Sequence, residues 1–176
     1  MRDHLLAEIE RWYSPDFVVL DGSPLLNLAA WAVLYKEGCI DEDSCLKAIQ
    51  ILTSKDKDVS KSDSIFDEFP ELSALRSLKL THLKLPDITI FLDVDPSIAA
   101  GRIEKRGERK QAHETEEKLA KLRKAYKMVC RVIERDLNIP TSTINAHGSI
   151  DPITREVWSF VKNHLKERED HGEGKN

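Results

Sequence analysis

Apolar runs along the chain predict three short strands. Residues 88–94, Ile-Thr-Ile-Phe-Leu-Asp-Val, are mostly β-branched or apolar and follow Pro86-Asp87, which is typical of a strand. The run Phe17–Leu20 stands between turn residues on both sides, and this predicts a strand that is buried on both of its faces. A third short strand is expected at Ser142–Asn145.

The residues between these runs have the spacing of helices. Apolar side chains recur every three or four positions from about residue 114 to residue 135 and predict a long helix. Asp95 and Pro96 are typical of the first residues of a helix, which we expect to end at Gly107. Further helices are expected at 5–12, at 25–35, at 41–52 and from 151 onwards. A polar loop is expected at 54–63, and one or two short helices within 66–85.

Strands that alternate with helices indicate an α/β fold with a parallel sheet. The chain of 176 residues suits one domain, expected over 1–168, with 40–85 as a helical or loop insertion and 169–176 as a disordered tail. Three cysteines, an odd number, suit a reducing cytoplasmic location. The net charge of -4 does not indicate a nucleic-acid partner, and no apolar run is long enough to span a membrane.

Polar residues follow each predicted strand, at the edge of a parallel sheet where ligands bind. The carboxylate of Asp21 could orient a hydroxyl, accept its proton or hold water on Mg²⁺; the alternative is a turn residue that caps the next helix. Asp93 is the stronger functional candidate after the second strand, because Asp95 is expected to be a helix cap. Asn145 ends the third strand.

Basic residues gather after the second strand. Arg102 and Arg106 are four positions apart and share one face of the predicted helix, and Arg109 and Lys110 follow Gly107 in a loop. Guanidinium groups bind phosphate through paired hydrogen bonds and stabilise charge on a transferring phosphoryl group. A basic loop between two helices is typical of a lid, and the alternative is a solvated charged face, since acidic residues interleave with the basic ones.

Several motifs that bind phosphate or metal are absent from the sequence. Neither G-x-x-x-x-G-K-[ST] nor G-x-G-x-x-G occurs, so no signature of a backbone phosphate loop is present. His113 and Glu114 begin like H-E-x-x-H, but residue 117 is glutamate, which excludes a zinc site of that type. The cysteines lack C-x-x-C spacing, which argues against a structural zinc site.

Three stretches together resemble the thymidylate kinase family of P-loop nucleoside monophosphate kinases. Residues 86–107 are similar to that family's strand, its following helix and the entry to its lid. Leu122–Tyr126 is similar to the long helix after the lid, and 143–165 to the closing strand and helix. Upstream, Phe17–Asp21 resembles the strand that ends in the family's Asp-Arg-aromatic motif, although Gly22-Ser23 stands where the family has arginine and an aromatic residue.

The resemblance implies a three-layer αβα fold with a parallel sheet and transfer of the γ-phosphoryl group of ATP, with Mg²⁺, to a nucleotide or nucleoside. It also implies that Asp21, with Ser23 beside it, orients the acceptor or the water shell of Mg²⁺. The transferring group would be bound by Arg102, Arg106 and Arg109, with Asp93 and Lys110 as further binding residues. The adenine would lie beside Asn145 and Ala146.

The family's fold begins with a P-loop strand and helix for which this sequence has no counterpart. That strand lies between the strands matched by Phe17–Leu20 and by 88–94, so we expect two unpaired strand edges. Three interpretations follow: the sequence is a fragment, a second polypeptide or homodimer partner completes the sheet, or the fold has closed over the gap and lost catalysis. A kinase and a non-catalytic α/β domain that binds a partner through a strand edge are therefore both hypotheses.

Overall fold

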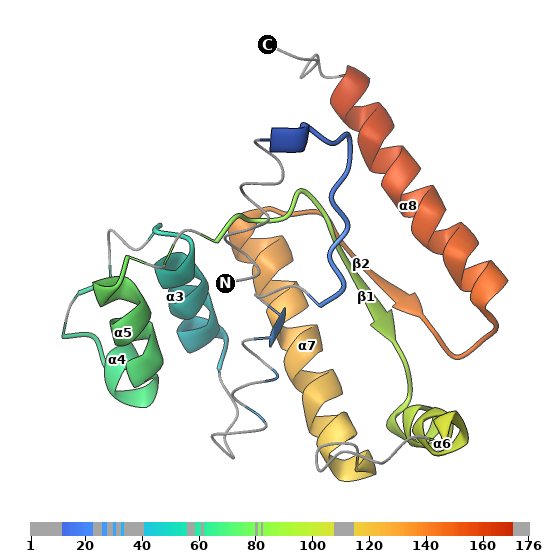
Figure 1. Cartoon of the computed structure of the whole chain (residues 1–176), viewed down its shortest axis with the longest axis horizontal. Coiled ribbons are helices and arrows are strands. Elements are labelled where there is room, and N and C mark those ends of the chain that lie inside the picture. Colours follow the sequence, from blue (N-terminus) through green and yellow to red (C-terminus); the bar gives the residue numbers. More distant parts are fainter. Residues whose placement is uncertain are drawn as a thin grey trace.

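The computed structural model describes residues 12–22, 26–27, 30, 33, 41–55, 59–60, 62–79, 81, 83–107 and 115–170, apart from the side chains of 167–170. Its elements follow in the order α3 (Glu42–Leu52), α4 (Ile65–Glu68), α5 (Pro70–Ser77), β1 (Thr89–Asp93), α6 (Pro96–Arg106), α7 (Glu116–Leu137), β2 (Thr141–Asn145) and α8 (Ile150–Asp170). Figure 1 shows the two strands between α7 and α8, with α3, α4 and α5 grouped beyond α7. The helices expected at 5–12 and 25–35 lie largely outside the described residues.

The two strands pair in parallel, with a register that runs from Thr89 opposite Thr141 to Asp93 opposite Asn145. Side chains alternate between the two faces of the sheet. Phe91 identifies the face covered by α7, since the centroid of its ring lies 5.9 Å from the ring centroid of Tyr126, a residue of α7. The strands predicted at 88–94 and 142–145 are confirmed, and they form the α/β sheet expected from the sequence.

The main hydrophobic core lies between α7 and the helices that precede the sheet. Ile49 and Cys45 of α3 and Val129 and Val132 of α7 are fully excluded from solvent. Asp41 caps α3, because its side chain accepts a 2.7 Å hydrogen bond from the Ser44 N–H. The helix predicted at 41–52 is therefore confirmed, and α4 and α5 are the short helices expected nearby.

Helix α6 begins and ends at the residues that the sequence indicated. The Asp95 side chain accepts a 3.1 Å hydrogen bond from the Ser97 N–H, and Pro96 occupies the first turn. Gly107 ends the helix with a φ of 73°, a left-handed conformation that favours glycine. No helix in the described ranges combines the length and the apolar character that crossing a membrane requires.

The prediction of a buried strand at Phe17–Leu20 is wrong. These residues form neither helix nor strand, and their exposed fractions run from 41% at Leu20 to 92% at Val19. A strand that is buried on both faces needs neighbours along its edges as well as above and below, and no neighbouring strand is found among the residues described. Apolar character alone thus did not bring this segment into the sheet.

Candidate functional site

The carboxyl ends of β1 and β2 meet at one edge of the sheet. Asp93 and Asn145 are register partners, and the Ala146 N–H donates a 2.7 Å hydrogen bond to the Asp93 carbonyl. The Asn145 Oδ1 accepts a 2.9 Å hydrogen bond from the His147 N–H, which shapes the turn after β2. The structure therefore brings together three residues that the sequence proposed: Asp93, Asn145 and Ala146.

Asp93 is held by two cations from α7. Arg123 donates from Nε to Oδ1 at 2.5 Å and from Nη2 to Oδ2 at 3.0 Å, and the Lys127 Nζ lies 2.7 Å from Oδ2. The hydrogen bonds from Arg123, followed by those from Lys127, lower the pKa of Asp93 to about 2, although burial opposes the shift. Both carboxylate oxygens are occupied, so Asp93 anchors α7 to the sheet.

Asp95 joins the same cluster from the start of α6. Its Oδ2 lies 3.3 Å from the Arg123 Nη1, and its Oδ1 accepts a 2.7 Å hydrogen bond from the Ser97 hydroxyl. The hydrogen bonds from Ser97 are the main cause that lowers the pKa of Asp95. Its backbone N–H donates to the His147 Nε2 at 3.0 Å, so this histidine nitrogen acts as an acceptor. Asp95 thus connects the end of β1, α6, α7 and the turn after β2.

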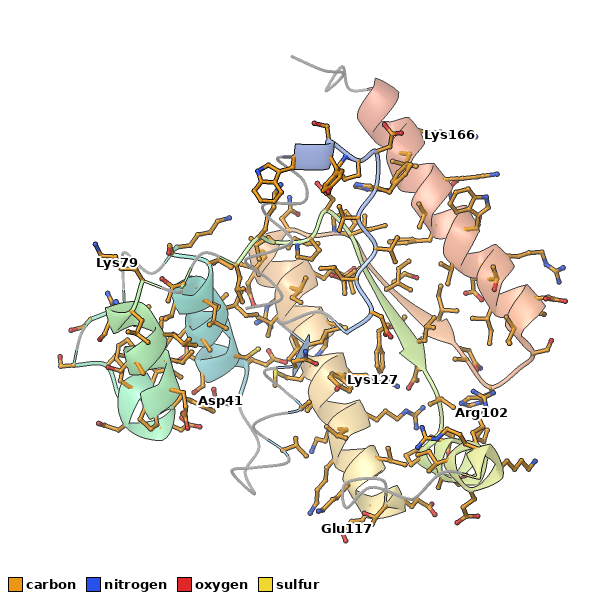
Figure 2. All side chains as sticks on the ribbon, viewed as in Figure 1. Asp41, Lys79, Arg102, Glu117, Lys127 and Lys166 are labelled. Atoms are coloured by element: carbon orange, nitrogen blue, oxygen red, sulfur yellow. The ribbon has the colours of Figure 1, made fainter. Side chains whose placement is uncertain are left out.

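Arg102 approaches this edge from α6. Its Nη2 donates hydrogen bonds to the carbonyls of His147, at 3.0 Å, and Gly148, at 3.3 Å. Figure 2 shows Arg102 between α6 and the chain that follows β2. Arg106 lies one turn further along α6, about 6 Å along the helix axis, and its side chain is exposed. The two arginines therefore sit beside the site, on the helix that leads into residues 108–114.

The remaining residues proposed from the sequence do not join this cluster. Asp21 is exposed after Phe17–Leu20, and within the described part of the chain no hydrogen bond or ion pair joins it to another residue. Ser23, Arg109 and Lys110 lie outside the described residues.

Sequence reasoning missed three residues of the cluster: Arg123, Lys127 and His147. The spacing of Arg123 and Lys127, four positions apart on a predicted helix, was a visible signal. Their shared partner lies 30 residues before Arg123, and nothing local in the sequence identifies it. His147 had no signal beyond its place after the third predicted strand.

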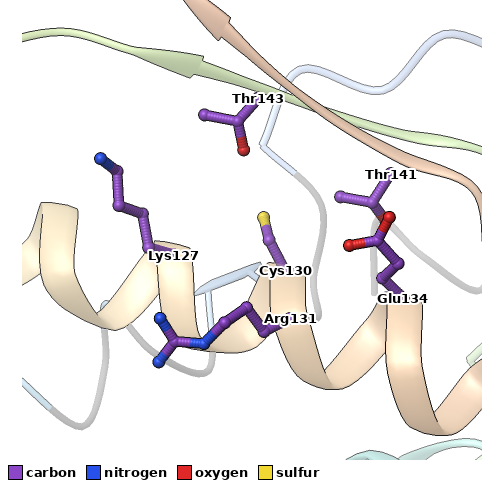
Figure 3. Close-up of a pocket in the computed structure, with 6 residues that line it drawn as sticks. All are labelled: Lys127, Cys130, Arg131, Glu134, Thr141 and Thr143. Carbon is purple, nitrogen blue, oxygen red and sulfur yellow. The ribbon is translucent and has the colours of Figure 1, made fainter.

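A cavity of about 270 Å³ lies between α7 and β2, on the α7 face of the sheet. Figure 3 shows its lining, which comprises Lys127, Cys130, Arg131, Glu134, Thr141 and Thr143. Its two basic groups have partners elsewhere, because Lys127 binds Asp93 and Arg131 lies 3.3 Å from Glu42. Burial raises the pKa of the Cys130 thiol to about 11, so the thiol is not activated. The carboxyl edge is therefore the stronger candidate site.

Comparison with known proteins identifies the family. A family model described as "Thymidylate kinase" matches residues 61–157, which is more than half of the chain. The chain belongs to the thymidylate kinase family. The matched range includes both strands, α6, α7 and the beginning of α8, and so contains the whole cluster around Asp93.

Individual relatives match only part of the chain. The thymidylate kinase of Leptospira borgpetersenii serovar Hardjo-bovis is 34% identical over 100 residues, which cover 55% of this chain and 44% of that protein. The thymidylate kinase of Leptospira interrogans serovar copenhageni is 34% identical over 102 residues, 58% of this chain and 46% of that protein. The probable thymidylate kinase of Sulfolobus acidocaldarius is 34% identical over 80 residues, with coverage of 46% and 39%. No solved structure matches the chain significantly.

Proposed function

We propose that this chain is the lid-bearing part of a nucleotide phosphotransferase, which moves the γ-phosphoryl group of ATP to a nucleotide or nucleoside. Family membership supports phosphotransfer as the class of reaction. The observation that carries the proposal is the arginine-bearing helix α6, fixed at the carboxyl edge of the sheet through Asp95 and Arg102. Ligands of α/β proteins bind at that edge.

The basic residues of α6 suit a role in holding phosphate. Phosphoryl transfer depends on positioning and on stabilisation of negative charge. The contacts of Arg102 with two carbonyls use one guanidinium nitrogen, which leaves its other N–H groups for an anion. We assign Arg102, Arg106 and Arg109 to the transferring group, with Lys110 as a further phosphate contact. Because its carboxylate is fully engaged, Asp93 is assigned to positioning rather than to ligand binding.

The acceptor and the adenine are assigned to two further pairs of residues. We assign Asp21 and Ser23 to the acceptor, and Asn145 and Ala146 to the neighbourhood of the adenine. Ala146 is buried directly after β2, and Asn145 holds the turn that follows. Hydrogen bonds hold the backbone at these positions, which suits recognition of a planar base.

The residues described do not build a site for Mg²⁺. Among them, no group of three or more His, Cys, Asp or Glu side chains could hold a metal ion. Asp93 and Asp95 are the aspartates at the carboxyl end of β1, and Arg123 forms an ion pair with each of them. We therefore assign neither aspartate to the binding of Mg²⁺.

Nucleotide binding and transfer test the proposal together. We expect Mg-ATP to raise the melting temperature, since a ligand at 100 times its Kd stabilises a protein by about 2.7 kcal/mol. Labelled ATP with a panel of nucleosides and nucleoside monophosphates would then identify the acceptor. Arg106→Ala should abolish transfer, whereas Lys105→Ala, its exposed neighbour, should not. Absence of both a thermal shift and transfer at millimolar ATP would exclude a kinase made by this chain alone.

The alternative function is a non-catalytic domain that binds a partner through a strand edge. The specific observation in its favour is that β1 pairs with β2 along one edge only, within the described residues. This function predicts partner binding that is insensitive to Mg-ATP and to Arg106→Ala.

A further inference from the structure

His147, in the turn between β2 and α8, has a hydrogen-bond partner for its ring and for both of its backbone groups. Its N–H donates to the Asn145 Oδ1 at 2.9 Å, and its carbonyl accepts from the Arg102 Nη2 at 3.0 Å. Its Nε2 accepts from the Asp95 N–H at 3.0 Å. One exposed residue thus joins the end of β2 to the N-cap and to the second turn of α6.

The two bonds to α6 fix both the start and the direction of this helix. Asp95 is the N-cap, and Arg102 lies seven positions later, which is two turns along the same face and about 10 Å along the axis. A helix that is tied at one point can pivot, whereas two points this far apart define its axis. Arg106, one turn beyond Arg102, is therefore placed by the same two contacts.

His147 also fixes the turn that follows β2. Its bond to the Asn145 side chain closes the turn, and the Ala146 N–H holds the turn to the Asp93 carbonyl at 2.7 Å. Under the function proposed above, this turn lies beside the adenine, and α6 carries arginines that contact phosphate. His147 therefore stands between the two parts of one nucleotide site.

We propose that His147 is a positioning residue of the nucleotide site, which through its ring and its carbonyl sets the adenine turn against the arginines of α6. This inference rests on the proposed function and adds that the base and the phosphates of one nucleotide are recognised together. The ring acts as an acceptor, so it is the neutral imidazole with its proton on Nδ1. A side chain that cannot accept at this place would release the start of α6 from the turn.

Two probes that differ by the nucleoside test this role in the whole chain: Mg-ATP, and Mg-tripolyphosphate, which has no base. Titration calorimetry measures the Kd of each, and we expect the unmodified chain to bind ATP more tightly. His147→Leu removes the acceptor and should weaken ATP binding by about five- to tenfold. The Kd of tripolyphosphate should change less, so the preference for ATP should fall.

Two further variants are the controls. His147→Gln supplies an amide oxygen close to the place of Nε2, so it should keep most of the preference for ATP. Ile150→Ala changes an exposed side chain three positions later and should leave both Kd values unchanged. Because His147 is exposed, all of these variants should fold, which circular dichroism checks.

The outcomes separate this role from the proposed function. An unchanged preference for ATP in His147→Leu would overturn the positioning role, and so would an equal loss in His147→Gln. Both results leave ATP binding by the unmodified chain intact. If the unmodified chain bound neither probe, the proposed function itself would be wrong, and the positioning role with it.

Discussion

Arg123 of α7 and Asp93 of β1 form a two-point ion pair, with donor–acceptor distances of 2.5 Å and 3.0 Å. The same guanidinium reaches Asp95, the residue that caps α6. One arginine therefore fixes how α6 and α7 are attached to the strand. Because these two helices flank residues 108–114, the positions of both ends of that connection depend on Arg123.

Removal of the Arg123 guanidinium should destabilise the fold. Arg123→Met keeps the aliphatic contacts but leaves Asp93, which is 13% exposed, with Lys127 as its remaining cation. Loss of hydrogen bonds to a charged group costs about 1.5–3 kcal/mol, so we expect a fall of about 2 kcal/mol in the free energy of unfolding. Urea denaturation measures it. Lys124→Met, at an exposed neighbouring position, is the control; an equal effect of both variants would contradict the assignment.

The low pKa of Asp93 predicts a dependence of stability on pH. Its pKa falls from 3.8 to about 2 on folding, so the ionised form stabilises the native state above pH 4. That contribution, about 2 kcal/mol from the size of the shift, should be lost as the pH falls from about 4 to 2. Asp93→Asn removes the titrating group. The difference in unfolding free energy between the two proteins should therefore shrink over this range, and a constant difference would contradict the prediction.

Two glycines of α6 should respond in opposite directions to substitution by alanine. Gly101 lies inside the helix with no atom within 4 Å of an added Cβ, so Gly101→Ala should stabilise the protein by about 0.5–1 kcal/mol. Gly107 also has open space around it, but its φ of 73° is unfavourable for alanine. Gly107→Ala should therefore destabilise by about 1 kcal/mol. Thermal denaturation of both variants measures the contrast, and the same sign of change in both would refute the role of backbone conformation.

The helices before the sheet should prove integral to the fold. Ile49 of α3 is fully buried against the core that α7 shares. Ile49→Ala should destabilise by about 2–5 kcal/mol, because it removes buried methyl groups and leaves a cavity. Ile150→Ala, at an exposed apolar position, should change stability by less than about 0.5 kcal/mol. Chemical denaturation compares the two, and a small effect at Ile49 would show that α3 is dispensable.

Local signals in the sequence predicted most of the elements. Asp95, Pro96 and Gly107 defined both ends of α6, because caps and turn glycines act through backbone groups a few residues away. The β-branched run at 88–94 identified β1 for the same reason. By contrast, Phe17–Leu20 has strand composition without a strand, since pairing depends on a partner that composition does not specify.

The sequence predicted where Asp93 and Asn145 lie in the fold, but not which side chains they contact. The rule that ligands bind at the carboxyl ends of parallel strands located Asp93 and Asn145 correctly at one edge. It did not show that Asp93 is already bound by Arg123 and Lys127, because those residues come from a helix far along the chain. The role of Asp21 in an active site stays a prediction.

The parallel register of β1 and β2 has a consequence for how the molecule forms. Thr89 and Thr141 lie more than fifty positions apart, and α6 and α7 lie between them. Helices form quickly from local contacts, whereas a pairing this distant must first close a long loop. We expect α7 to collapse onto α3 early, with the two strands aligned only after α7 has brought β2 back to β1. The Asp93 cluster would then be among the last parts of the protein to assemble.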